Sequence, residues 1–103
     1  YLESKRLIAK KYQDWGKSNN LVFFEEPINT CSNYWLNVAV TENKETRDLF
    51  LQITNNSNVM TRPVWTPMHK LLMYKHCQRT NMKTTEWLYK RAVNVPSSPI
   101  LTN

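Results

Sequence analysis

The sequence predicts an α+β domain in which helices pack on one face of a small three-stranded sheet. Segments with apolar residues at helical spacing alternate with short segments rich in β-branched and aromatic residues. Their order is helix, strand, strand, helix, strand, helix, which is typical of two-layer α+β proteins. A length of 103 residues with 41% hydrophobic residues is suited to a single folded domain, residues 1–103, with a modest core.

The first predicted helix covers residues 2–15. Ile8, Tyr12 and Trp15 form its apolar stripe, at the spacing of an amphipathic helix. The only glycine of the chain, Gly16, follows directly and is expected to end the helix, because glycine readily adopts the left-handed conformation of helix ends.

Two strands are expected next, over residues 21–24 and 34–40. The second has the strongest strand pattern of the chain, since side chains of successive strand residues point to opposite faces. The face expected to lie in the core is formed by Tyr34, Leu36, Val38 and Val40.

The next predicted helix covers residues 44–54, after a turn and N-cap within residues 41–43. It leaves through the asparagine-rich residues 55–58, one of which is expected to be left-handed. The third strand is expected at residues 59–61, and a single helical turn at residues 71–74. A last helix, residues 85–92, is predicted to start at a Thr84 cap.

Residues 61–69, Thr-Arg-Pro-Val-Trp-Thr-Pro-Met-His, carry a cation, an indole and an imidazole on a backbone with two prolines. Proline fixes φ and disfavours helix at the residue before it. The segment is therefore expected to form a rigid ledge that presents its side chains at the edge of a binding site. The plainer alternative is a proline-rich connection that covers a small core.

Three more segments surround this ledge in a fixed order. They are Ser-Asn-Tyr-Trp-Leu-Asn at 32–37, Met-Tyr at 73–74 and Asn-Val-Pro-Ser-Ser-Pro at 94–99. In this order, the segments resemble the C-terminal small domain of the DegT/DnrJ/EryC1/StrS family, the pyridoxal-phosphate-dependent sugar aminotransferases of fold type I. The resemblance is greatest to members acting on nucleotide-linked amino-sugars of the legionaminic, bacillosamine and perosamine type. It covers nearly the whole chain, without the large cofactor-binding domain and the final helix.

The resemblance implies that the chain forms one wall of a substrate cleft. The substrate-binding residues that it implies are Asn33, Tyr34, Arg62, Trp65 and His69. Arg62 would form forked bonds to a phosphate or carboxylate, His69 would donate to a sugar hydroxyl or phosphate, and Trp65 would stack on a sugar face. Each has a structural alternative. These are pairing of Arg62 with Glu42 or Glu45, a core position for Trp65, and capping of backbone carbonyls by His69.

No catalytic residue is expected in this chain. Pyridoxal phosphate needs a lysine that forms an imine with it and a carboxylate that protonates its ring nitrogen, and the nine lysines stand in polar or basic runs. The cofactor is implied only for the full-length family. Two hypotheses follow: a part of a sugar aminotransferase, or a free-standing, non-catalytic remnant that acts as a binding or oligomerisation module. The expected partners are a second copy of the chain or a large domain, together with a nucleotide-sugar.

Charge, motif spacing and hydropathy do not indicate a nucleic-acid-binding protein, a zinc or cysteine-nucleophile site, or a membrane protein. The net charge of +6 is concentrated in residues 59–103, but no nucleic-acid-binding motif accompanies it, so nucleic acid is an unlikely partner. His69, His76 and Cys77 match no zinc spacing, and Cys77 beside His76 lacks an orienting carboxylate. The chain has neither a membrane-spanning run nor a signal peptide, which predicts a cytoplasmic protein with reduced cysteines.

Overall fold

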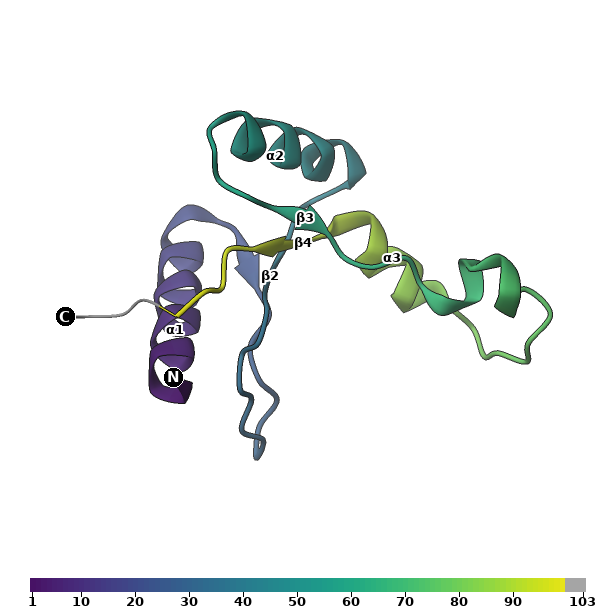
Figure 1. Cartoon of the computed structure of the whole chain (residues 1–103), viewed down its shortest axis with the longest axis horizontal. Helices are drawn as coiled ribbons and strands as arrows, with labels where there is room; N and C mark the ends of the chain where they lie inside the picture. Colours follow the sequence, from purple (N-terminus) through teal and green to yellow (C-terminus); the bar gives the residue numbers. More distant parts are fainter. Residues whose placement is uncertain (100–103) are drawn as a thin grey trace.

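A computed structural model describes residues 1–99 and shows the predicted α+β architecture. Figure 1 shows α1, α2 and α3 arranged around a central sheet. In chain order the elements are α1 (Leu2–Asn19), β1 (Val22–Phe23), β2 (Asn37–Val40), α2 (Lys44–Asn56), β3 (Arg62–Pro63), the 3₁₀ turns η1 (Met68–Lys70) and η2 (Leu72–Tyr74), α3 (Lys83–Arg91) and β4 (Ala92–Val95).

The sheet has four antiparallel strands in the order β1-β2-β4-β3, so the prediction of three strands was wrong. The missed strand, β4, is an inner one, and it follows α3 without a connecting loop because Ala92 is already extended at φ −83° and ψ 138°. The third strand also lies later than the predicted residues 59–61, at Arg62–Pro63. Since proline has no N–H to donate, its position on the outermost strand is the one that a sheet tolerates.

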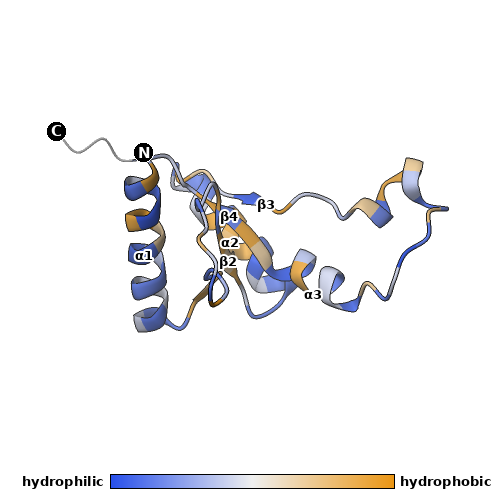
Figure 2. Ribbon diagram, turned by 90° about the horizontal axis from the view of Figure 1, so that it is seen from below, coloured by the Kyte–Doolittle hydropathy of each residue, from blue (hydrophilic) through white to orange (hydrophobic). Residues whose placement is uncertain are grey.

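The core lies on the sheet face that carries Phe23, Ala39 and Val95, against which Tyr12 of α1 and Phe50 of α2 pack. In antiparallel pairing, directly opposed residues share a face, and the register pairs Phe23 with Ala39 and Ala39 with Val93. Figure 2 shows the same arrangement by hydropathy, with an apolar β4 in the centre and a largely polar α1 at one side.

The core face predicted for the second strand was wrong. Asn37 and Ala39 are buried, whereas Val38 and Val40 remain half-exposed. The Asn37 amide is tolerated in the core because its backbone N–H and its Nδ2 both donate to Ser97 Oγ, at 2.9 and 3.1 Å. The strand also starts three residues later than predicted, after Tyr34, whose φ of 45° interrupts an extended chain.

Gly16 does not end the first helix. α1 continues to Asn19, and Asn20 takes the left-handed conformation with φ 56°. The glycine is needed for a close approach instead, because a Cβ there would lie 2.3 Å from the Leu21 carbonyl oxygen and 2.7 Å from the Phe23 ring. This contact brings β1 directly against the helix.

The second helix starts at Lys44 as predicted and ends two residues later than predicted, at Asn56. Asn43 caps its start, with Oδ1 accepting from the Thr46 N–H at 2.7 Å. Past its end, Asn58 is left-handed with φ 63°, as expected for one of the asparagines at residues 55–58.

The last helix begins earlier than predicted and is not capped by Thr84. Met82 occupies the N-cap position without a side-chain cap, and the Lys83 N–H donates instead to Asn81 Oδ1 at 2.9 Å. The helix ends at Arg91 because the next residue already belongs to β4.

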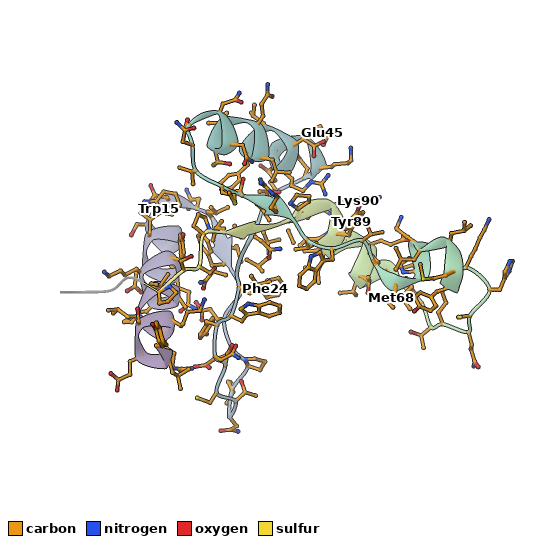
Figure 3. All side chains as sticks on the ribbon, viewed as in Figure 1. Trp15, Phe24, Glu45, Met68, Tyr89 and Lys90 are labelled. Carbon is orange, nitrogen blue, oxygen red and sulfur yellow. The ribbon has the colours of Figure 1, made fainter. Side chains whose placement is uncertain are left out.

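The ledge leaves β3 and leads to a projecting arm, formed by η1, η2 and the loop before α3 (Figure 1). Figure 3 shows Met68 on this arm. The radius of gyration is 15.3 Å, against about 13 Å for a compact chain of this length. The arm thus stands away from the core. Within residues 1–99, no helix has the length and apolar content to cross a bilayer.

Candidate functional site

An ion pair between Arg6 of α1 and Glu26 organises the loop between β1 and β2. Arg6 Nη2 and Nη1 donate to the two carboxylate oxygens at 2.6 and 3.0 Å. The Ser32 N–H also donates to Glu26 Oε2 at 2.6 Å, and Arg6 Nη1 donates to the Ser32 carbonyl. The bonds from Arg6 and from Ser32 lower the pKa of Glu26 to about 2. Both ends of the loop are therefore tied to one guanidinium.

Tyr34 completes this arrangement. The Arg6 guanidinium lies 5.6 Å from the centre of its ring, and the Glu26 N–H donates to its hydroxyl at 3.0 Å. These residues line a hollow of about 500 Å³ beside α1. Tyr34, predicted as a substrate-binding residue, thus faces α1 and is held by protein contacts.

Trp35 and Trp65 form an exposed aromatic pair between the start of β2 and the ledge. Their ring centres are 5.9 Å apart, and the side chains are 64% and 72% exposed. Asn33 Oδ1 accepts from the Trp35 N–H at 3.0 Å, and Lys5 donates to the Trp35 carbonyl at 2.9 Å. Asn33 therefore supports the backbone of Trp35, and Trp65 is not a core residue.

Arg62 points toward the end of α2. Its Nη1 donates to Asn55 Oδ1 at 2.9 Å and to the Thr61 carbonyl at 2.8 Å. The alternative pairing with Glu42 or Glu45 is not among its contacts with residues 1–99. The side chain stays exposed, so its remaining guanidinium donors can meet a ligand.

His69 lies where η1 meets α3. Its Nε2 is 3.2 Å from Glu86 Oε1, and its side chain is only 12% exposed. It lines a hollow of about 470 Å³ together with Pro67, Met68, Tyr74, Cys77, Gln78, Arg79, Met82 and Thr85. Its partner is a carboxylate, not the backbone carbonyls of the alternative expectation. The hydrogen bond from His69, followed by the charge of Lys70, lowers the pKa of Glu86.

The five predicted site residues therefore fall into separate places. Asn33 and Trp65 are brought together through Trp35, whereas Tyr34, Arg62 and His69 contact α1, α2 and α3 respectively. Sequence reasoning missed Trp35 and Glu86. The adjacent Tyr34 and Trp35 were a signal for the first, but Glu86 lies 17 residues from His69 and had no local signal.

The described residues do not fit the covalent attachment of pyridoxal phosphate. All nine lysines lie within residues 1–99 and none is buried, so the chain offers no desolvated amine for an imine. Residues 1–99 also contain no group of three or more His, Cys, Asp or Glu side chains placed to hold a metal ion, so His69, His76 and Cys77 form no such site.

A sequence profile of the DegT/DnrJ/EryC1/StrS aminotransferase family matches residues 1–103, the whole chain. The chain belongs to this aminotransferase family. Among curated relatives, GDP-perosamine synthase of Vibrio cholerae is 27% identical over 101 residues, and that of Escherichia coli O157:H7 is 30% identical over 104. These matches cover 95% and 100% of this chain but 28% of each relative. The chain therefore spans little more than a quarter of the length of these curated relatives.

Solved aminotransferases have the same fold over this region. A DegT/DnrJ/EryC1/StrS aminotransferase from Brucella abortus aligns with a TM-score of 0.79 at 22% identity, over 99% of this chain and 27% of its own. The aminotransferase TlmJ from Streptoalloteichus hindustanus aligns with a TM-score of 0.78 at 17% identity, over 94% and 26%. The α+β fold predicted from the sequence pattern is thus confirmed, and it is the fold of this region in solved aminotransferases.

Proposed function

We propose that the chain is the small-domain part of a pyridoxal-phosphate-dependent sugar aminotransferase and forms one wall of the cleft that binds the nucleotide-sugar. The observation that carries this proposal is the family match over residues 1–103 together with coverage of only 28% of each GDP-perosamine synthase. The catalytic residues would then lie on the part of the aminotransferase that this chain does not span.

The exposed side chains of the ledge support the proposal. Trp65 offers an aromatic face beside Trp35 for a sugar ring, and Arg62 offers guanidinium donors for a phosphate or carboxylate. His69 opens onto the hollow beside α3. Asn33 and Tyr34 would act indirectly, Asn33 by setting the position of Trp35 and Tyr34 by holding the loop tied to Arg6.

By itself the chain would not transfer amino groups. When bound, pyridoxal phosphate supplies the electron sink of transamination, and its covalent attachment requires a lysine in a desolvated setting. In this chain eight lysines are exposed, and the half-buried Lys5 donates to the Trp35 and Ser97 carbonyls. The purified chain mixed with pyridoxal phosphate should therefore lose its imine absorbance on dialysis. Stoichiometric retention of the cofactor would contradict this part of the proposal.

The second candidate function is a non-catalytic binding or oligomerisation module. An apolar groove of about 370 Å³ between α1 and α2 favours it, because such a surface usually receives a partner. The groove is lined by Tyr12, Trp15, Leu21, Phe23, Phe50, Thr54, Val59, Thr61, Val95 and Pro96. The gene sequence upstream of the Tyr1 codon separates the candidates. An in-frame, lysine-bearing large domain supports the aminotransferase, and a start codon at or just before Tyr1 supports the module.

A further inference from the structure

We infer that Glu86 is a positioning residue that fixes the tautomer of His69, so that the neutral imidazole presents Nδ1 as an acceptor to a ligand hydroxyl. The identity of the ligand rests on the proposed function. The tautomer of His69 depends only on contacts within this chain. Glu86 lies on α3, outside the ledge of residues 61–69, and thereby gains a role in the candidate site.

His69 is the donor in its contact with Glu86. His69 Nε2 lies 3.2 Å from Glu86 Oε1. An ionised carboxylate only accepts hydrogen bonds, and a glutamate carboxyl group is ionised at neutral pH even before its pKa is lowered by His69 and Lys70. Nε2 must therefore carry the proton. A neutral imidazole has only one N–H, so Nδ1 is left with a lone pair.

The His69 ring lies at the wall of a hollow. His69 lines the hollow of about 470 Å³ in front of α3, and Glu86 is not among the lining residues. The hydrogen bond of the His69 ring is at Nε2, and within residues 1–99 no buried side-chain nitrogen lacks a hydrogen-bond partner, so Nδ1 is accessible from the surface and left for a ligand. With a side chain 12% exposed, His69 is sufficiently enclosed for one orientation to be maintained.

The charged groups around the ring come from three segments. Glu86 is on α3, and Lys70 of η1 lies 3.9 Å from its Oε1. Arg79 of the preceding loop donates to the His69 carbonyl at 3.3 Å, and Lys90 of α3 adds a positive charge near Glu86. Lys70 and Lys90 favour the ionised form of Glu86, and thus the Nε2–H tautomer of His69.

The consequence is a preference for the kind of ligand group. A sugar hydroxyl can donate to Nδ1, whereas a fully ionised phosphate has no proton to donate. The sequence led us to expect that His69 donates to a sugar hydroxyl or phosphate. For the neutral ring we now expect His69 Nδ1 to accept a hydrogen bond from a sugar hydroxyl instead. The hollow beside His69 would take the hydroxyl-bearing part of the nucleotide-sugar, and phosphate would be met by other donors.

The direct test is the tautomer of His69, measured by long-range ¹H–¹⁵N correlation spectra of the full chain at a pH where the imidazole is neutral. The Nε2–H tautomer is expected for His69, and Glu86→Ala should shift its nitrogen signals toward a mixture of tautomers. His76, the other histidine, is exposed and should give the same signals in both proteins. An Nδ1–H tautomer in the unchanged chain would overturn the inference, whether or not the variant folds.

A binding measurement separates this inference from the proposed function. If both hold, Glu86→Ala should weaken binding of a nucleotide-sugar by about fivefold, the equivalent of one hydrogen bond, and leave binding of inorganic phosphate unchanged. An equal loss for both ligands would contradict the hydroxyl preference. Absence of nucleotide-sugar binding in the unchanged chain with the Nε2–H tautomer present would count against the proposed function alone.

Discussion

Arg6 of α1 holds both carboxylate oxygens of Glu26, with nitrogen to oxygen distances of 2.6 and 3.0 Å. The same guanidinium donates to the Ser32 carbonyl at 2.6 Å and covers the Tyr34 ring. Trp35 is the next residue after Tyr34. The position of its indole opposite Trp65 therefore depends on the ion pair between Arg6 of α1 and Glu26. The ledge is thus only one half of the candidate site.

Stability should depend on the charge of Glu26 in an acidic range. Its folded pKa of about 2 lies below the ordinary value of 4.5. A lowered carboxyl pKa contributes stability above the unfolded value, and this contribution is lost as the pH falls through the folded value. In urea unfolding, Glu26→Gln should therefore be less stable than the unchanged chain at pH 6, and the difference should shrink between about pH 4.5 and 2. A difference independent of pH would contradict the charged pairing.

Gly16→Ala should destabilise the chain although alanine favours helix. The new methyl group would meet the Leu21 carbonyl at 2.3 Å, and a backbone atom cannot move aside as a side chain does. Overpacking of this kind typically lowers the free energy of unfolding by about 1–3 kcal/mol. Thermal or urea unfolding measures the effect. Lys11→Ala, at an exposed position of the same helix, is the matched control and should stay within about 0.5 kcal/mol.

Ser97→Ala should destabilise the core. Ser97 Oγ accepts from both the backbone N–H and the Nδ2 of Asn37, which is only 5% exposed. Removing the hydroxyl leaves buried donors without a partner, at a cost of about 1–3 kcal/mol in the free energy of unfolding. Ser98→Ala, at the exposed neighbouring position, should be close to neutral. Equal effects of the two changes would show that the serine hydroxyl does not stabilise the Asn37 site.

Several features that depend on neighbouring residues were predicted correctly, and several that depend on residues far apart in the chain were not. The α2 helix, its Asn43 cap and the left-handed Asn58 depend on neighbouring residues and were predictable. The strand β4 was missed because Ala92–Val95 is short and lies inside the sheet, where pairing on both sides outweighs local preference. The buried face of β2 was reversed because Ser97, 60 residues away, satisfies Asn37.

The candidate site divides in the same way. Arg62, Trp65 and His69 were predicted together because they share one proline-stiffened segment. Their partners Asn55, Trp35 and Glu86 lie on three other segments, and only the fold shows these contacts.

We propose that the purified chain forms a dimer through apolar surface that it does not cover itself. Trp15 on α1 and Trp87 on α3 are 55% and 49% exposed, and the groove beside Tyr12 is apolar. Burial of such side chains is worth about 1.5–3 kcal/mol each, and at physiological salt the repulsion between net charges of +6 is largely screened beyond about 8 Å. Sedimentation at micromolar concentration should show a concentration-dependent species larger than 12.3 kDa. A single monomer at all concentrations would contradict the proposal.

The central claim is that these residues form a substrate wall of a sugar aminotransferase, and a graft tests it most directly. Residues 1–103 would replace the matching segment of the GDP-perosamine synthase of Vibrio cholerae, and amino transfer would be measured on a graft that retains its cofactor. The account predicts measurable transfer that Trp65→Ala lowers at least tenfold, while Lys11→Ala leaves it unchanged. A folded, cofactor-loaded graft that transfers no amino group, or one that is insensitive to Trp65→Ala, would contradict it.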